Sequence, residues 1–307
     1  MIPLSLAQIA RACGGELRGD AAHPVDPGAV VHGEVVIDSR RVRPGGLFAA
    51  VAGERADGHD FAAAAVAAGA VAVLATRPVP APSVLVADVP AALAALARQV
   101  VDALPAARVA GITGSSGKTS TKDLAAQLAE RLGPTIAPAG SFNNEFGHPL
   151  TVLRADASTR YLVLELSARG AGHIAYLCRI APPRYGVVLN VGHAHAGEFG
   201  GLDQVARAKG ELVEALPADG AAILNADDPR VLAMAARTGA AEPGAQLKVT
   251  TRAAVRAAMA RTRGSSAFKM ATPSAGSAST SSPLARATWS RPPNSPACAW
   301  PTFSTTP

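Results

Sequence analysis

The feature that most constrains this chain is a glycine-rich turn, with the sequence GITGSSGKTSTKD at residues 111–123. The apolar run ARVAGIT leads into the turn and predicts a buried strand. A helical pattern follows, with Leu124, Leu128 and Leu132 at a spacing of four residues, and it stops at a Gly-Pro pair typical of a helix exit. The segment therefore predicts a strand, a tight turn and a helix in that order.

This order of elements predicts a phosphate-binding cradle, because backbone N–H groups converge on phosphate oxygens at the positive end of a helix. In such a turn Lys118 would reach the β- and γ-phosphates, and Thr119 would hold Mg²⁺. The strict spacing GxxxxGK[ST] is not met, because Ile112 occupies the first glycine position. The turn reads GxxGxxGKT instead, and this departure narrows the P-loop families to which it can belong.

Up to residue 240 the chain alternates short apolar runs with helical segments, which indicates an α/β fold with a mainly parallel sheet. The predicted strands are 71–76, 83–88, 161–166, 186–191 and 221–226. An apolar-rich helix at 91–104 ends at Pro105, and we place a domain boundary there. We therefore expect an N-terminal domain at 1–105 and a second domain at 106–240 that contains the glycine turn.

Polar side chains follow three of these strands, where open α/β sheets bind ligands. They are Glu165 after the first, Asn190, His193 and His195 after the second, and Asn225, Asp227 and Asp228 after the third. Glu165 ends a buried strand and fits an acidic group near a γ-phosphate, holding a second metal or a water, although a paired or solvated carboxylate stays an alternative. The loop NVGHAHAGEFG at 190–200 offers two imidazoles and Glu198, which suit either a metal site or a polar connection. Lys209 lies in a context, ARAKGEL, that is typical of a solvated helix lysine.

The stretch 241–307 does not read like a folded domain. It contains no Asp or Glu after Glu242, and from Ser265 onward Ser, Pro, Ala, Thr and Arg dominate. The apolar residues there follow neither the two-residue spacing of a strand nor the spacing of a helix. Both tryptophans stand near prolines, which interrupt helices and central strands. One interpretation is a disordered basic tail. The interpretation we favour is a shifted reading frame. A GC-rich gene that is translated one nucleotide out of frame yields a sequence rich in Arg, Ser, Pro and Thr.

Composition excludes several classes of protein. The net charge of +6 comes from the tail, because 21 of the 29 Lys/Arg and 22 of the 23 Asp/Glu precede residue 240. The main body is thus near neutral and lacks the excess of positive charge that binding to a nucleic-acid phosphate backbone requires. Three scattered cysteines do not form a disulfide framework, and the most apolar stretch, 61–76, is too short to span a bilayer. No signal peptide is visible, so we expect a cytoplasmic protein without a membrane anchor. We also expect the protein to be a monomer.

The motifs that would specify other nucleotide-dependent chemistry are absent from the sequence. There is no NKxD, which disfavours a guanine-specific GTPase, and there are no HRD or DFG texts of a protein kinase.

Several stretches in order resemble the Mur ligase family, from about residue 5 to about residue 240. They are DSRRVRPGGLFAAVAGERADGHDF (38–61), GITGSSGKTSTKD (111–123), GSFNNEFGHPLTVL (140–153), LELSARGAGHI (164–174), LNVGHAHAGEFG (189–200), AKGEL (208–212) and LNADDP (224–229). The text FNNE resembles the branch that joins D-alanyl-D-alanine to UDP-N-acetylmuramoyl-tripeptide in cell-wall synthesis. The resemblance implies an N-terminal domain that binds the UDP substrate and a central ATPase domain that uses Mg²⁺.

The resemblance also implies site residues. The nucleotide contacts would be Gly114, Ser115, Ser116, Gly117, Lys118, Thr119, Ser120, Asn225 and Asp228. The catalytic residues would be Lys118, Glu165, His195 and Lys209, and the metal ligands Thr119, Glu165, His195 and Lys209, with the lysine at 209 carbamylated. The substrate contacts would be Ser39, Arg40, Asn143, Asn144 and Glu145.

The implied reaction is ATP-dependent amide formation through an acyl phosphate. Family members continue with further central strands and a C-terminal Rossmann-like domain that this sequence lacks, so we expect little or no ligase activity from the chain as written. Two alternatives stay open: another ligase of the superfamily, such as the one adding the third residue or a folate polyglutamate ligase, and a non-catalytic fragment that binds nucleotide or UDP substrate.

Overall fold

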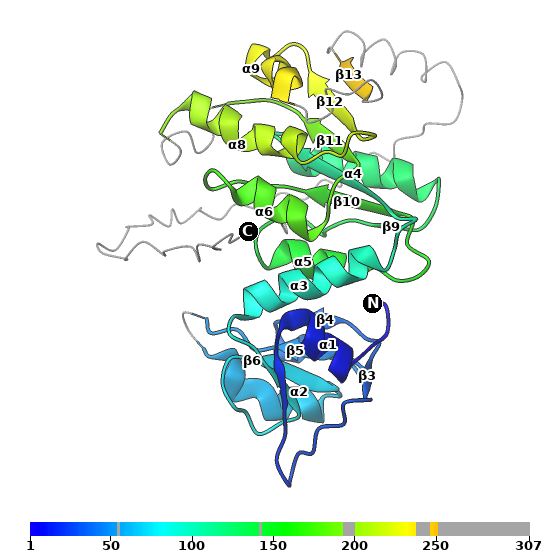
Figure 1. Ribbon diagram of the computed structural model, residues 1–307, viewed down its shortest axis with the longest axis vertical. Helices are drawn as coiled ribbons and strands as arrows, with labels where there is room; N and C mark the ends of the chain where they lie inside the picture. Colours follow the sequence, from blue (N-terminus) through cyan, green and yellow to red (C-terminus); the bar gives the residue numbers. More distant parts are fainter. Residues whose placement is uncertain (54–55, 141–142, 193–199, 238–245, 251–307) are drawn as a thin grey trace, which may run out of the picture. The chain divides into compact units, whose positions relative to one another are not determined.

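The computed structural model describes residues 1–53, 56–140, 143–192 and 200–237 in full, and the backbone of residues 246–250. The described residues belong to one compact unit. They form two larger β-sheets, one on either side of residue 105 (Figure 1). None of the described helices is long and apolar enough to cross a bilayer.

The N-terminal sheet has the strand order β2-β7-β6-β5-β4. β2 runs antiparallel to β7, and the other neighbours are parallel. The elements before residue 105 are β1 (Leu4–Ser5), α1 (Leu6–Cys13), β2 (Glu16–Arg18), β3 (Val30–Val31), β4 (Val35–Val36), η1 (Ser39–Arg41), β5 (Leu47–Ala49), η2 (Gly58–Phe61), α2 (Ala62–Ala67), β6 (Ala72–Ala75), β7 (Ser83–Leu85) and α3 (Val89–Asp102).

The central sheet has the strand order β13-β12-β11-β8-β10-β9, and every neighbouring pair is parallel. The described elements are β8 (Arg108–Thr113), α4 (Lys118–Glu130), β9 (Thr135–Ile136), α5 (Gly147–Val152), β10 (Tyr161–Glu165), α6 (His173–Ile180), β11 (Tyr185–Val188), α8 (Leu202–Glu214), β12 (Ala221–Asn225), α9 (Pro229–Leu232), η3 (Ala233–Arg237) and β13 (Gln246–Thr250). The α/β architecture and the mainly parallel sheet are as the sequence predicted.

Helix starts and strand burial follow from local sequence. Ser5 and Gln8 form a capping box at the start of α1, and Asp88 caps α3 by accepting a hydrogen bond from the Ala91 N–H. β6 consists of four apolar residues that are all buried, as expected of a parallel strand covered on both faces. The helix predicted at 91–104 begins two residues earlier, at Val89 directly after its cap, and ends at Asp102.

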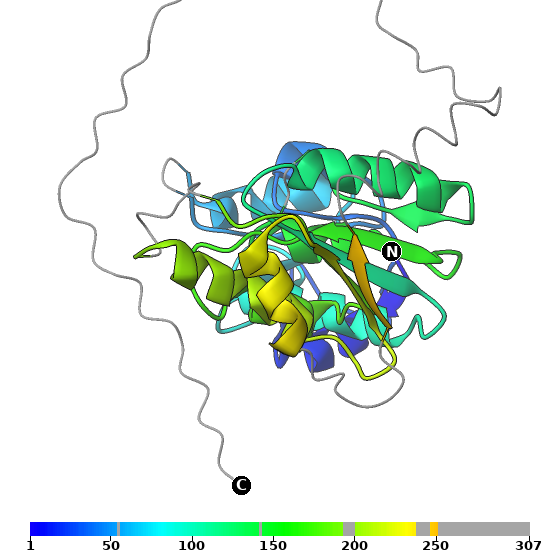
Figure 2. The same ribbon diagram turned by 90° about the horizontal axis from the view of Figure 1, so that it is seen from above.

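The connections of the central sheet decide which face each helix covers. α4 leads from β8 toward the β9 edge, whereas α5, α6 and α8 lie on connections that run toward the β13 edge. Right-handed crossovers in opposite directions place helices on opposite faces of a sheet. Figure 2 shows this arrangement, with α4 on one face and α8 and α9 on the other. The glycine turn lies at the carboxyl edge of the sheet, between β8 and α4. Among the described connections of the central sheet, the one through α4 is the only one that runs toward the β9 edge.

The leucine spacing that predicted α4 does not mark its buried face. Leu124, Leu128 and Leu132 are 54%, 60% and 74% exposed. The buried positions of this helix are Lys122 and Ala126. Leu124 and Leu128 form an apolar stripe on the outside of α4, and Leu132 follows just past the end of the helix; we call these three residues the α4 stripe.

One hydrophobic core runs across the predicted boundary at residue 105. α3 packs against α1 on one side and against α5 and α6 on the other. Leu93 and Leu96 of this helix belong to the same buried cluster as Leu162 and Leu177 of the central part. The division into domains at 1–105 and 106–240 remains a prediction.

The end of the central sheet corrects one expectation. β13 pairs in parallel with β12, from Ala221 opposite Gln246 to Asn225 opposite Thr250. This strand lies inside the stretch 241–307 that we expected to be a tail outside the fold. A five-residue strand carries too little periodicity to stand out beside the text that follows it. Residues 251–307 lie outside the described residues.

Candidate nucleotide-binding site

Glycine is required at two positions of the turn between β8 and α4. Gly117 has φ +79°, in the left-handed region, and immediately precedes the helix. At Gly114 a side chain is excluded by packing, because a Cβ atom would lie 2.9 Å from Cβ of Leu189. The backbone of the turn therefore lies closer to β11 than a turn with side chains could.

Asn190, which follows β11, holds the turn in place. Its Oδ1 accepts a hydrogen bond from the Ser116 N–H at 3.0 Å, and its Nδ2 donates to the Ser116 carbonyl at 3.1 Å. The hydroxyl of Ser115 accepts a hydrogen bond from the Gly192 N–H at 2.8 Å. Sequence reasoning placed Asn190 at a strand end but did not predict this clamp, which depends on β11 lying beside β8.

The first residues of α4 face the carboxyl end of β10. The Lys118 ammonium folds back over the turn and donates to the Gly114 carbonyl at 2.9 Å. The Thr119 hydroxyl donates to Oε2 of Glu165 at 2.9 Å. Ser116, Gly117 and Ser120 are exposed, so the outer side of the turn is open to solvent.

Glu165 is the centre of this site. It is buried, and both of its oxygens accept hydrogen bonds: Oε2 from Thr119, and Oε1 from Nδ2 of Asn143 at 2.7 Å. The structure thus brings together three residues predicted from separate stretches of sequence. A hydroxyl and a carboxylate beside a phosphate cradle are oxygen ligands of the kind that Mg²⁺ prefers.

Lys209 of α8 is buried, so the interpretation of its local context as a solvated helix lysine is wrong. Burial, with a smaller contribution from the nearby Lys118 ammonium, lowers the pKa of this lysine to about 8. Two residues along the helix, the Glu211 carboxylate accepts hydrogen bonds from the N–H groups of Gly172 (2.5 Å) and Ala175 (3.0 Å). Glu211 therefore caps α6 from the neighbouring helix, a contact that sequence reasoning missed.

His195 lies outside the described residues, as do His193 and Glu198 of the same loop. Within the described ranges, no group of three or more His, Cys, Asp or Glu side chains is arranged to hold a metal ion.

Asn225 and Asp228, predicted near the nucleotide, brace the strand end that supports the turn. Nδ2 of Asn225 donates to the Leu189 carbonyl at 2.9 Å. Oδ2 of Asp228 accepts a hydrogen bond from the Val191 N–H at 2.7 Å, while its other oxygen caps α9. Both side chains reach the segment that carries Asn190.

Asn144 and Glu145, predicted to face the peptidyl substrate, lie at the start of α5. Oδ1 of Asn144 accepts a hydrogen bond from the Gly147 N–H at 2.8 Å. Oε2 of Glu145 lies 3.8 Å from Nε2 of His173, which is buried at the start of α6. Burial lowers the pKa of His173, and Glu145 opposes that effect.

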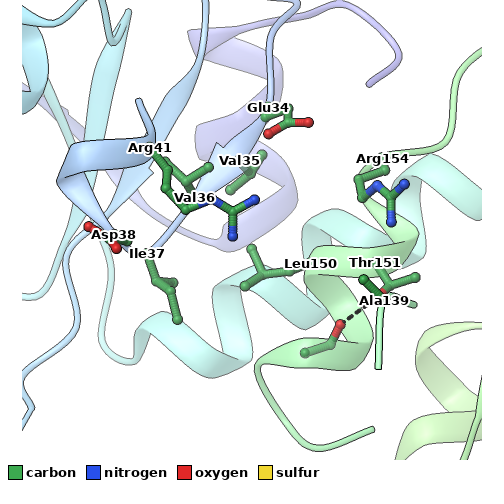
Figure 3. Close-up of a pocket in the computed structure, with 11 residues that line it drawn as sticks. Glu34, Val35, Val36, Ile37, Asp38, Arg41, Ala139, Leu150, Thr151 and Arg154 are labelled. Carbon is green, nitrogen blue, oxygen red and sulfur yellow. Dashed lines mark hydrogen bonds between the residues drawn. The ribbon is translucent and has the colours of Figure 1, made fainter. Parts of the chain in front are cut away.

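A pocket of about 320 Å³ lies between the N-terminal part and α5 (Figure 3). It is lined by Glu34, Val35, Val36, Ile37, Asp38, Arg41, Ala139, Gly147, Leu150, Thr151 and Arg154. Figure 3 shows the guanidinium groups of Arg41 and Arg154 on two sides of this space, with Leu150 between them.

Ser39 and Arg40, the predicted UDP-substrate contacts, do not line this pocket. They lie in η1 between two residues that do, Asp38 and Arg41. Arg40 instead pairs with Asp38 at 2.8 Å, and this hydrogen-bonded guanidinium lowers the pKa of Asp38 to about 2. The pocket residues on α5 lie in the quoted stretch 140–153, but sequence reasoning assigned none of them to a site.

The fold and this site define an α/β protein of the P-loop class. The chain belongs to the Mur ligase family: residues 112–286 match the Mur ligase middle domain, and residues 31–127 match a domain described as Mur ligase family, catalytic domain. The first of these matches, like β13, extends past residue 240.

Individual relatives give the same result. The chain is 52% identical over 267 residues to the UDP-N-acetylmuramoyl-tripeptide–D-alanyl-D-alanine ligase of Mycobacterium tuberculosis, and 41% identical over 230 residues to that of Escherichia coli. These alignments cover 78% and 74% of this chain, and 51% and 49% of the relatives. The chain therefore spans about half the length of the curated relatives it matches.

Solved structures agree. A crystal structure of MurF from Acinetobacter baumannii superposes with a TM-score of 0.70 at 30% identity, covering 81% of this chain and 53% of that one. MurF from Thermotoga maritima in complex with ADP gives a TM-score of 0.63 at 35% identity, covering 71% and 50%.

Proposed function

We propose that this chain carries the nucleotide-binding and UDP-substrate-binding parts of an ATP-dependent ligase. The ligase would join D-alanyl-D-alanine to UDP-N-acetylmuramoyl-tripeptide in the cytoplasm during peptidoglycan synthesis, and the chain would be a monomer. The relatives that carry this name support the substrates. The observation that carries the proposal is the hydrogen-bonded group of Thr119, Glu165 and Asn143 beside a glycine cradle.

In this proposal the turn binds the triphosphate. Gly114, Ser115, Ser116 and Gly117 would present backbone N–H groups to the phosphates, aided by Ser120. Lys118 would leave the Gly114 carbonyl and pair with the β- and γ-phosphates, because an anionic oxygen is a stronger acceptor than a backbone carbonyl. Asn225 and Asp228 would lie near adenine and ribose, at the strand end they brace.

The donor set fits Mg²⁺. Thr119 and Glu165 supply a hydroxyl and a buried carboxylate 2.9 Å apart, and His195 would complete the set from its loop. Lys209 fits the carbamylation implied by the family, because a buried amine with a lowered pKa gains an anionic, metal-binding form on reaction with CO₂. Bound Mg²⁺ would neutralise charge shared among the carboxylate, the phosphoryl oxygens and ADP.

The UDP substrate would be held by the N-terminal part and its peptide directed toward the turn. Ser39 and Arg40 are the proposed contacts, and the neighbouring pocket offers space, with the guanidinium groups of Arg41 and Arg154 and the carboxylates of Glu34 and Asp38 in its lining. Asn143, Asn144 and Glu145 would meet the peptide. Asn143 supports this role best, since its side chain already bridges to Glu165.

The proposed chemistry has two steps. The terminal carboxylate of the tripeptide attacks the γ-phosphorus of ATP, giving an acyl phosphate and ADP. The amine of D-alanyl-D-alanine then attacks the acyl carbon, forms the amide, loses a proton and releases phosphate. Lys118 holds positive charge beside the transferring phosphoryl group, where it stabilises the transition state.

The experiment uses the full chain with both peptide substrates. Isothermal calorimetry should detect Mg²⁺-dependent nucleotide binding and binding of UDP-N-acetylmuramoyl-tripeptide, and a coupled assay would follow ADP release that requires both substrates. Binding without turnover would favour the second candidate, a non-catalytic fragment, which the half-length coverage of the relatives also favours. Turnover with a single amino acid in place of the dipeptide would contradict the proposed acceptor.

A further inference from the structure

Lys122 is a buried cation that the proposed reaction does not use. It lies one turn after Thr119 in α4, and its side chain is fully buried. An ammonium group is costly to bury unless it is paired and hydrogen-bonded. Its place in the core of a nucleotide-binding domain therefore needs a physical reason.

The partners of Lys122 connect α4 to the loop that follows β9. Its Nζ donates to the Pro138 carbonyl at 2.6 Å and to the Gly140 carbonyl at 3.2 Å. Asp123, whose side chain is exposed, lies 2.6 Å from the same nitrogen and supplies the counter-charge. The two carbonyl contacts fix the loop, whereas Asp123 is a neighbour on the same helix.

Asn143, three residues after Gly140 along the chain, contacts Glu165, so Gly140 is tied to α4 directly and Asn143 is tied to it through Glu165. Thr119 of α4 donates to one oxygen of Glu165, and Asn143 donates to the other. Three residues before Asn143, the Gly140 carbonyl returns to α4 through Lys122.

We propose that Lys122 is a positioning residue that couples occupancy of the nucleotide site to the placement of Asn143 for the peptidyl substrate. This inference rests on the proposed function. When Thr119 and Glu165 turn toward a bound nucleotide, a loop without its anchor shifts with the carboxylate. With Lys122 in place, the loop stays against α4 and Asn143 remains at the site.

The test uses the full chain and the variant Lys122→Met, which keeps the length of the side chain but removes its donors. Asp123→Asn is the matched control, because it removes the counter-charge and leaves both carbonyl contacts. Calorimetry would measure Kd for UDP-N-acetylmuramoyl-tripeptide with and without saturating Mg²⁺ and a non-hydrolysable ATP analogue. The ratio of the two Kd values is the coupling between the sites.

We expect Lys122→Met to weaken substrate binding in the presence of nucleotide by about tenfold or more and to bring the coupling ratio close to one. The Kd for the nucleotide itself should change by less than about threefold. Asp123→Asn should keep the coupling ratio of the unmodified chain, because both carbonyl contacts stay, although losing the counter-charge lowers its stability. Unchanged coupling in Lys122→Met would overturn the proposal. An equal loss of nucleotide and substrate affinity would also overturn it, because it would indicate a purely structural role.

A second measurement separates this proposal from the proposed function. If the unmodified chain binds neither ligand, the proposed function fails, and hydrogen exchange without ligand then tests the anchor. Lys122→Met should raise amide exchange across residues 136–140 and 143–150 while Asp123→Asn does not, and no rise would overturn the anchor. If Lys122→Met does not fold, Lys122→Gln replaces it, with effects of the same direction.

Discussion

His148 predicts a specific loss of stability in mild acid. Its imidazole is buried in α5, and neither ring nitrogen has a hydrogen-bond partner among the described residues. Burial, with a smaller contribution from the neighbouring His173, lowers the pKa of His148 from 6.5 to about 4. The Leu177 backbone opposes part of this effect, although its geometry is too poor for a hydrogen bond.

The sign and size follow from proton linkage. In the unfolded chain His148 takes up a proton near its ordinary pKa, whereas in the folded chain it stays neutral to a lower pH. The folded state is therefore favoured fully above about pH 6.5, and that advantage is lost as the pH falls toward 4. One pKa unit corresponds to about 1.4 kcal/mol, so the loss reaches about 2 kcal/mol by about pH 5 and about 3 kcal/mol by about pH 4.

The assay is urea unfolding of the full chain at several pH values between about 7.5 and 4. His148→Leu removes the titrating group, so its free energy of unfolding should fall less with acid than that of the unmodified chain, by the amounts above. Any steric cost of leucine is present at every pH and cancels in this comparison. His32→Gln is the control, because that imidazole is exposed and its loss should leave the acid dependence unchanged.

Parallel curves for His148→Leu and the unmodified chain would refute this reasoning. Such a result would mean that His148 either finds a partner or takes up its proton without cost. His173 beside His148, and Glu145, Arg169 and Glu211 around His173, stay in place in both proteins.

Three further predictions follow from particular contacts. Glu211→Gln leaves one N–H at the start of α6 without an acceptor and should cost about 1–2 kcal/mol in urea unfolding, whereas Glu214→Gln breaks only a surface ion pair and should cost less than about 1 kcal/mol. Leu128→Glu on the α4 stripe should change stability by less than about 0.5 kcal/mol and raise solubility, while Ala126→Glu on the buried face should unfold the helix at neutral pH. With ¹³C-bicarbonate, NMR should show one carbamate signal that is absent from Lys209→Ala, and its persistence in that variant would assign it elsewhere.

Much of the fold could be predicted, because buried parallel strands are short continuous apolar runs. The strands that carry the turn and Glu165 were found in this way. The α4 stripe shows the limit of periodicity, since a spacing of four residues marks one face of a helix without saying which face is covered. That choice depends on the handedness of the crossovers and on what packs against the sheet.

Residues of the candidate site were predictable where a suitable side chain stands at a glycine turn or at the end of a predicted strand. Thr119 and Glu165 were expected near phosphates, and the structure places their side chains 2.9 Å apart. Lys122 and Glu211 were missed, because their partners are backbone groups far along the chain. Only the tertiary structure turns an ordinary helix lysine into an anchor.

The central claim is that the turn at 111–123 binds a nucleoside triphosphate through backbone N–H groups and the Lys118 ammonium. The most direct measurement is calorimetric titration of the full chain and of Lys118→Met with a non-hydrolysable ATP analogue, with and without Mg²⁺. We predict Mg²⁺-dependent binding that weakens by about 10- to 100-fold in Lys118→Met, the size of a lost hydrogen-bonded charge pair. No binding by the folded, unmodified chain, or equal affinity in both proteins, would contradict the claim.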